Sequence, residues 1–368
     1  MLTRTDSETI VRKLLKKPSA AIAVAIIALT FFIAAFAYVL APDKSPNANQ
    51  MVIELAARPP GFHTKLLLVP KYIRQEEPSM LRQWLSGKPS SYHAVPINGY
   101  RWEGDQLFVQ HYVDEGVEDT MMFSLTSLSP DGHSFEQIEK EQIIDRTYWL
   151  GTDRYGRDIL SRLLVGARVS LAVGLVAVIL SLSIGIVLGA LAGYFGGIVD
   201  NLVMWVINML WAIPTLLLVF AITLSIGKGF WEIFIAIGLT MWVSAARLIR
   251  GQVLVLREME YITAAKALGF TDMRIIFRHI LPNIAGPLMV IAASNFATAI
   301  LVEAGLSFLG IGVQPPQPSW GLMIKEHYNF LITNRPLLAI IPGLAIMLLV
   351  YAFNVLGNAL RDVLDVRA

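Results

Sequence analysis

The sequence predicts an all-α polytopic membrane protein, and its composition and the spacing of its charges carry this prediction. Of the 368 residues, 55% are hydrophobic and only 16% are charged, whereas a soluble domain carries about 25% charged residues. Long uncharged runs separate the charges, and a helix needs about 20 mostly apolar residues to cross the hydrocarbon core of a bilayer. The composition therefore excludes an ordinary cytosolic enzyme and a disordered chain.

Six such runs predict six transmembrane helices. They cover residues 20–40, 169–199, 201–227, 229–246, 280–302 and 336–360. The first run is longer than the apolar core of a signal peptide, which has about 7–15 residues, so we expect residues 1–40 to be a cytoplasmic N-terminus followed by an uncleaved anchor. The fourth run contains Glu232, whose side chain must lie at the end of the helix or face protein.

Basic residues beside the helices predict the orientation, because short basic segments stay in the cytoplasm. They gather in residues 4–17 and 247–278, and Arg361 and Arg367 lie near the C-terminus. We therefore expect both termini and the 247–278 connection to be cytoplasmic. Residues 41–168 must then be extracytoplasmic, which is permitted because long translocated segments escape the charge rule.

Residues 41–148 predict a small β-rich insertion between the first two helices. Strand-like segments cover residues 65–69, 106–113 and 120–128. Asn98-Gly99 marks a turn, and Ser134 with Gln137 forms a capping box that begins a short helix. A structural cover or docking surface is one interpretation of the insertion, and direct substrate handling is another.

The histidines of this insertion do not predict a metal site. They are His63, His93, His111 and His133. No two of them have the spacing of metal ligands, and the chain contains no cysteine that could supply a thiolate. We therefore expect no bound metal.

Residues 257–283 contain the strongest local pattern, two short helices separated by a stop. Alanines at 264, 265 and 267 favour helix. Gly269 suits the left-handed conformation that ends a helix, Thr271 or Asp272 can cap the next one, and Pro282 can begin the following span. Such a compact element suits insertion into a groove of a partner, although the residues alone favour an ordinary surface loop between spans.

This segment resembles the EAA loop of ABC-transporter permeases. The family pattern is Glu-Ala-Ala, three residues, Gly, nine residues and Ile-x-Leu-Pro, and the matching residues here are Thr263, Ala264, Ala265, Gly269, His279, Leu281 and Pro282. Thr263 replaces the glutamate, so this position has no acid for a salt bridge, and His279 replaces the isoleucine. The His-Ile-Leu-Pro-Asn form resembles the dipeptide and oligopeptide branch. The resemblance implies that the loop docks on an ATPase subunit through Ala264, Ala265 and Gly269.

Residues 150–171 resemble a second signature, that of the C-type permease of the same branch, and overlap an interfacial amphipathic segment expected at 149–168. Its matching residues are Gly151, Thr152, Asp153, Gly156, Arg157 and Asp158. Residues 159–167 have one apolar face, so we expect an amphipathic helix at the extracytoplasmic interface, with Asp158 and Arg162 as an i,i+4 ion pair. Asp153 and Asp158 are expected in turn and cap roles, not as an acid–base pair.

Residues 303–321 resemble the stretch that follows the fifth span in these permeases. Their glycines and prolines predict irregular backbone, which near a membrane lines a cavity or is buried in protein. Glu303, Ser307 and Phe308 are therefore candidates for a pathway or gate, and an interface acid that pairs with a neighbour is the alternative for Glu303. The three motifs tie residues 150–321 to the family, whereas residues 41–148 are not covered.

Small residues and prolines predict how the helices of the 169–368 core pack and bend. Gly185, Gly189 and Gly193 recur every four residues and allow another helix to approach closely. Pro214, Pro287 and Pro342 can kink the third, fifth and sixth spans.

An absent motif and the resemblance together define the expected assembly. The sequence has no Gly-x4-Gly-Lys-Ser/Thr phosphate loop, so we expect no enzyme activity in this chain, no bound cofactor, and ATP and Mg²⁺ only in partner subunits. The resemblance implies a homologous second permease, two ATPase subunits and an extracytoplasmic binding protein in the bacterial inner membrane. It implies import of peptides, with nickel or another small solute as the alternative.

Other classes of membrane protein fit the sequence poorly. A rhomboid-type protease needs Gly-x-Ser-Gly, and the nearest string, at residues 305–308, ends in Phe308. A channel has no need for the helical loop at 257–283. The net charge of +2 shows no footprint for nucleic acid.

Overall fold

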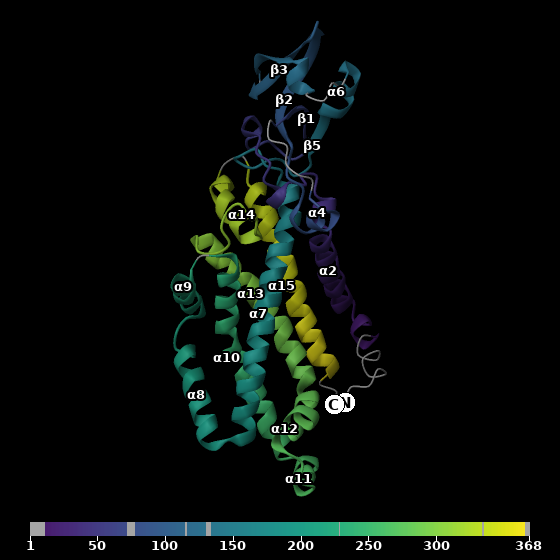
Figure 1. Cartoon of the computed structure of the whole chain (residues 1–368). Coiled ribbons are helices and arrows are strands. Elements are labelled where there is room, and N and C mark those ends of the chain that lie inside the picture. The colour runs from purple at the N-terminus through teal and green to yellow at the C-terminus, as the bar shows by residue number, and fades with distance from the viewer. Residues whose placement is uncertain are drawn as a thin grey trace.

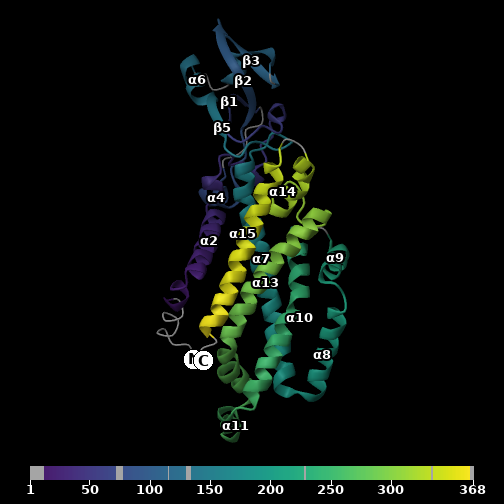
Figure 2. The ribbon, with the colours of Figure 1, turned by 180° about the vertical axis from the view of Figure 1, so that it is seen from behind.

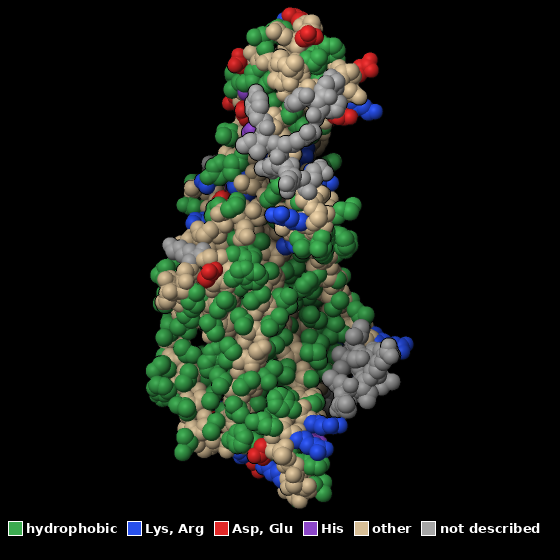
Figure 3. Space-filling model, viewed as in Figure 1, with side chains coloured by type: hydrophobic (Ala, Val, Ile, Leu, Met, Phe, Trp, Pro, Cys, Tyr) green, Lys and Arg blue, Asp and Glu red, His purple; other side chains and the backbone are tan. Residues whose placement is uncertain are grey.

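Long apolar helices form most of the molecule, and a small β-sheet domain stands on one end of the bundle (Figure 1). This computed structural model describes residues 12–71, 78–114, 116–129, 134–227, 229–332 and 335–364, so the expectation for His133 lies outside the described residues. Figure 2 shows the same arrangement from behind, with the short helix α11 at the end farthest from the sheet. On the face drawn in Figure 3, hydrophobic side chains cover the middle and charged side chains gather at both ends.

Five helices in the described residues are long and apolar enough to cross a membrane, or six if a bent pair counts as one span. The long helices are α2 (Pro18–Ala35), α7 (Ile159–Phe195), α10 (Phe230–Arg257), α13 (Ala285–Leu309) and α15 (Leu337–Leu364). The bent pair is α8 (Gly197–Trp211) and α9 (Thr215–Ile226), whose axes differ by 94°. The span predicted at 201–227 corresponds to this pair, and the kink predicted at Pro214 lies at its break. Pro214 precedes α9 and has no N–H with which to continue the helix.

The amphipathic helix predicted at residues 159–167 forms the beginning of α7, which continues into the second span. Helix α7 has 37 residues, which corresponds to about 55 Å, and residues 159–168 are its first turns. The apolar Ile159 and the charged Arg162 are both fully buried. This part of the helix therefore lies against protein on more than one face.

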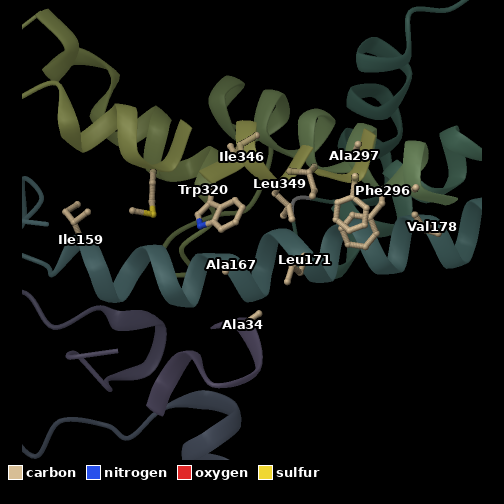
Figure 4. Close-up of a cluster of buried hydrophobic side chains, with 14 of the residues drawn as sticks. Ala34, Ile159, Ala167, Leu171, Val178, Phe296, Ala297, Trp320, Ile346 and Leu349 are labelled. Atoms are coloured by element: carbon tan, nitrogen blue, oxygen red, sulfur yellow. The ribbon is translucent and has the colours of Figure 1, made fainter. Parts of the chain in front are cut away.

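Close helix contacts hold the bundle together. A Cβ atom on Gly185 would lie 2.6 Å from the Ala245 Cβ, so α7 and α10 pack at the distance that only glycine allows. Figure 4 shows the central cluster, in which Leu171 of α7, Phe296 of α13 and Leu349 of α15 meet. Trp320 of the short helix α14 (Trp320–His327) packs into the same cluster.

The domain at the other end contains a five-stranded antiparallel sheet with the order β4-β3-β2-β1-β5. The strands are β1 (Phe62–Pro70), β2 (Tyr92–Glu103), β3 (Gln106–Asp114), β4 (Val117–Ser124) and β5 (Ile143–Tyr148). Strands predicted at 65–69 and 106–113 lie within β1 and β3. The strand predicted at 120–128 ends at Ser124, which caps α5 (Leu125–Leu128). The capping box of Ser134 and Gln137 is confirmed at the start of α6 (Phe135–Gln142).

Short elements complete the chain. Those on the side of the sheet are α3 (Ala37–Leu40), η1 (Pro46–Ala48), η2 (Ile53–Leu55), α4 (Met80–Ser86) and η5 (Tyr328–Ile332). Those at the opposite end are α11 (Glu260–Ala267), α12 (Asp272–Ile275), η3 (Ile276–Ile280) and η4 (Leu281–Ile284). The described chain ends meet, because Lys17 Nζ lies 2.8 Å from Asp362 Oδ2.

Candidate functional site

The loop at 257–283 folds as two short helices joined at a glycine. Gly269 has a φ of +79°, a left-handed conformation that glycine adopts without strain. Its N–H donates to the Lys266 carbonyl at 2.9 Å, and the Phe270 N–H donates to the Ala265 carbonyl at 3.1 Å. These bonds satisfy carbonyl groups at the end of α11, so the turn has a defined shape.

One side of this loop is packed firmly against the membrane helices. Ile262, Ile275 and Ile280 are fully buried and form one cluster with Ile249 of α10. Ala265 belongs to the same cluster and is only 4% exposed. The Ala265 side chain therefore supports the loop from inside, and its role as a contact for a partner stays a prediction.

The other side of the loop presents apolar side chains to the surroundings. Leu268, Met273 and Phe277 are 74%, 53% and 65% exposed, and we name these three the exposed loop residues. Thr263, Ala264 and Gly269 are also exposed. Exposed apolar side chains on a rigid element are typical of a protein contact.

The remaining residues of the loop pattern shape its return to the membrane helices. The His279 ring stacks on Phe270 at a centroid distance of 5.8 Å, and its carbonyl accepts from Asn283 Nδ2 at 2.6 Å. Leu281 and Pro282 are half-buried, and Pro282 lies at the start of η4. These residues therefore position the loop more than they form its surface.

The signature at 151–158 forms a buried joint between the sheet domain and α7. The carboxylate of Asp153 accepts from the N–H groups of Tyr155 (2.8 Å) and Arg157 (2.9 Å), which confirms its turn role. Asp158 caps α7 by accepting from the Ser161 N–H at 2.9 Å, and burial raises the pKa of its carboxyl. The Arg58 N–H donates to Thr152 Oγ1 at 2.8 Å. The signature thus connects distant segments inside this chain.

Two glycines of the signature are required by conformation and by close contact. Gly151 and Gly156 have φ values of +78° and +71°. A Cβ on Gly156 would collide with the Val52 carbonyl, and a Cβ on Gly151 would collide with the Arg58 carbonyl. Both glycines therefore let the 52–58 segment lie directly against the signature.

A buried network of four charges lies at this joint. Glu326 Oε2 accepts from Arg157 Nη2 at 3.0 Å and from Arg162 Nη2 at 2.9 Å. Asp153 Oδ2 pairs with Arg157 Nε at 2.6 Å. The expected Asp158–Arg162 pair is wrong, because Asp158 turns back to cap the helix while Arg162 points to Glu326 in α14.

The same joint contains three groups with the chemistry of metal ligands. Ligand atoms of Asp153, Glu326 and His327 lie within 4.8 Å of one another. Both carboxylates are engaged by the guanidinium groups of Arg157 and Arg162, so the four charges already balance. Burial lowers the pKa of His327, whose Nδ1–H donates to the Met323 carbonyl at 2.7 Å.

Glu303 lies enclosed at the end of α13. It is fully buried, and its Oε1 accepts from Ser307 Oγ at 2.6 Å. The Ser307 hydroxyl oxygen in turn accepts from the Val313 N–H at 3.1 Å, which holds the turn after the helix. Phe308 is 46% exposed and packs edge-on against Tyr328. A role of these residues in a pathway stays a prediction.

The sequence patterns missed the partners of the charged residues. Glu326 lies 169 positions from Arg157 and 164 from Arg162, so no local spacing relates them. A single acid in the mostly apolar segment before η5 was the available signal.

The long apolar helices and the packed helical loop define an integral membrane protein of the multi-pass class. The family profile described as "Binding-protein-dependent transport system inner membrane component" matches residues 185–368, half of the sequence, and the chain belongs to this family. The resemblance found from the motifs is therefore confirmed, and the chain is a membrane component of a transport system.

Curated relatives agree with this assignment. The chain is 43% identical over 218 residues to the glutathione transport system permease protein GsiD of Pectobacterium atrosepticum, covering 59% of this chain and 72% of the relative. It is 45% identical to the dipeptide transport system permease protein DppC of Alkalihalophilus pseudofirmus (59% and 71%) and 41% identical to the oligopeptide transport system permease protein OppC of Bacillus subtilis (60% and 72%). A chain of the solved inward-facing MetNI methionine ABC transporter aligns with 55% of this chain over 96% of its own length, with 22% identity and a TM-score of 0.45.

Proposed function

We propose that this chain is the permease subunit of an ABC importer that carries di- and oligopeptides across the bacterial inner membrane. The observation that carries this proposal is the shared chemistry of the relatives. Glutathione, dipeptides and oligopeptides, for which the relatives are named, are all peptides.

The proposed assembly contains a homologous second permease, two ATPase subunits and an extracytoplasmic binding protein. ATP and Mg²⁺ bind to the ATPase subunits, and the pathway lies between the two permeases. In this arrangement residues 41–168 are extracytoplasmic and the 257–283 loop is cytoplasmic. The basic residues that flank the loop support this orientation.

The proposed coupling begins at the exposed loop residues. Leu268, Met273 and Phe277 enter a groove of the ATPase subunit, where burial of their apolar surface stabilises the complex. The isoleucine cluster on the inner side keeps the loop rigid. When ATP closes the ATPase dimer, the loop moves as one body and the helices rock between inward and outward access.

The docking step is tested with a matched pair of substitutions. Met273→Glu places a charge on an exposed methionine of the loop, and Met122→Glu places the same charge on an exposed methionine of β4. We expect affinity purification of the Met273→Glu complex from native membranes to lose the ATPase subunits but keep the second permease. Met122→Glu keeps both. Retention of the ATPases by Met273→Glu contradicts docking through these residues.

The substrate is tested with the purified complex in proteoliposomes that contain ATP. We expect uptake of radiolabelled dialanine or trialanine when the binding protein is added, and no uptake when a non-hydrolysable ATP analogue replaces ATP. Uptake of Ni²⁺ without uptake of either peptide contradicts the peptide assignment and supports the small-solute alternative.

A further inference from the structure

A single tyrosine joins the end of α7 to the 257–283 loop. Tyr194 is 5% exposed, and its hydroxyl donates to Asp272 Oδ1, the first residue of α12, at 2.6 Å. The Lys266 Nζ of α11 lies 5.2 Å from the centre of the tyrosine ring. The phenol of α7 is therefore held between the two short helices of the loop.

This hydrogen bond differs in kind from the other contacts of the loop with the membrane helices. Among the residues that the structure describes, it is the one side-chain hydrogen bond that joins residues 260–284 to α7, α8 or α10. The apolar cluster that contains the isoleucines, and the Lys266 ammonium near the Tyr194 ring, supply further contacts. Apolar packing is not directional, whereas a hydrogen bond requires a defined distance and angle.

The end of α7 is fixed to α10 at the same level. Arg257 Nη1 donates to the Tyr194 carbonyl at 3.1 Å. A Cβ on Gly193 would lie 2.8 Å from both the Arg250 carbonyl and the Val253 Cβ, so the two backbones are nearly in contact. Any displacement of Tyr194 must therefore carry this end of α10 with it.

Helix α10 in turn holds α8 through two arginines. Arg250 forms a bidentate pair with Asp200, in which Nη2 lies 2.6 Å from Oδ2 and Nε contacts Oδ1. Arg247 Nη2 donates to Asn208 Oδ1 at 2.8 Å, and its guanidinium lies 3.6 Å from the centre of the Trp211 ring. The two arginines thus bind α8 near both of its ends.

We propose that Tyr194 and Asp272 are the positioning residues that transmit movement of the docked loop, through α10, to α8 and the bent pair it forms with α9. This inference rests on the proposed function, since it names the residues through which the ATPase contact acts. A bidentate arginine pair and a hydrogen bond to a carboxylate define distance and angle between the elements that they join. The loop, α10 and α8 therefore move together.

The test uses the full transporter complex with spin labels on this chain, which has no native cysteine. Met209→Cys on α8 and Met347→Cys on α15, both exposed, carry the labels in a complex whose other cysteines are replaced. Their distance is measured with and without a non-hydrolysable ATP analogue, together with ATP hydrolysis and ATPase copurification. Tyr194→Phe removes the donor, and Tyr351→Phe makes the same change at an exposed tyrosine of α15.

We expect the Tyr194→Phe complex to keep its ATPases and hydrolyse ATP, while the ratio of the ATP-induced to the resting distance population falls about fivefold, the effect of one lost hydrogen bond. Tyr351→Phe behaves as the unmodified chain. Asp272→Asn keeps an acceptor oxygen and the response, whereas Asp272→Ala loses it. An unchanged response in Tyr194→Phe, loss of the ATPases from it, or loss of the response in Asp272→Asn overturns the inference.

A wrong proposed function would give a different experimental result from a wrong role for Tyr194. In that case the unmodified chain copurifies with no ATPase subunit, or its labels do not respond to the nucleotide at all. A response in the unmodified chain that Tyr194→Phe leaves intact rejects only the transmitting role of the tyrosine.

Discussion

At the scale of single residues, the buried charges of the joint are the most consequential feature. Arg157 and Arg162 are 2% and 0% exposed, and a buried charge is tolerated only when it is paired and hydrogen-bonded. Both share Glu326, while Asp153 holds Arg157. The two negative and two positive groups therefore depend on one another.

Neutralising Glu326 should destabilise the chain strongly. Glu326→Gln keeps the shape of the side chain but leaves two buried guanidinium groups with Asp153 as their remaining charge partner. Removal of one partner from a buried pair costs about 3–5 kcal/mol, so the thermal unfolding midpoint in detergent should fall clearly. Glu136→Gln, on the exposed surface of α6, should leave the midpoint unchanged. Equal midpoints for the two variants would show that the network adds no stability.

His327 should make stability depend on pH. Its pKa is lowered by burial, so below an ordinary histidine pKa of about 6.5 the unfolded chain binds a proton that the folded chain does not. Stability is therefore present above that pH and is lost as the pH falls through it. In unfolding scans between pH 7.5 and pH 5.5, His327→Gln should lose less stability than the unmodified chain, while the exposed His93→Gln should follow the unmodified chain. Parallel curves for all three proteins would contradict this account.

The residue scale also shows what the sequence could and could not predict. The turn role of Asp153 and the capping role of Asp158 were predictable, because both bonds reach only a few positions along the chain. The partner of Arg162 was not, because Glu326 comes close only after α14 folds back against α7. Local hydrogen bonds are encoded by spacing, whereas buried ion pairs depend on the packing of the whole chain.

At the scale of elements, glycine determines how closely α7 and α10 approach. The four-residue spacing of Gly185, Gly189 and Gly193 predicted such an approach. A Cβ added at any of these glycines would lie within 3.0 Å of an atom of α10. The same spacing could not identify the partner helix. Proline behaved similarly, since Pro214 predicted a bend in the third span but not its size of 94°.

Substitution of Gly189 should separate the two helices. An alanine Cβ would lie 2.5 Å from the Ala246 carbonyl oxygen, a backbone atom that cannot rotate away, and such overpacking costs about 1–3 kcal/mol. Gly251→Ala is the matched control, because a Cβ there has no atom within 4 Å and alanine favours helix by about 1 kcal/mol. Gly189→Ala should lower the unfolding midpoint and Gly251→Ala should keep or raise it. A midpoint for Gly189→Ala as high as that of the control would mean that the helices do not need this contact.

At the scale of the whole molecule, polar ends enclose an apolar middle. The sheet domain and the 257–283 loop lie at opposite ends of the bundle (Figure 1), and the hydrophobic surface lies between them (Figure 3). Helix α7 alone extends for about 55 Å, more than the roughly 30 Å of a hydrocarbon core. The joint at Asp153 and Glu326 connects this helix to the sheet domain. The family profile does not include the sheet domain.

This arrangement leads to a direct test of orientation. Because the chain has no cysteine, one introduced thiol at a time reports which side of the membrane it faces. Thr120→Cys lies on the exposed edge strand β4 and Ala267→Cys lies at the exposed end of α11. In spheroplasts, a membrane-impermeant maleimide should label Thr120→Cys at once and Ala267→Cys only after the membrane is opened. Labelling of Ala267→Cys in sealed spheroplasts would show that the chain has the opposite orientation. The loop could then not reach a cytoplasmic ATPase.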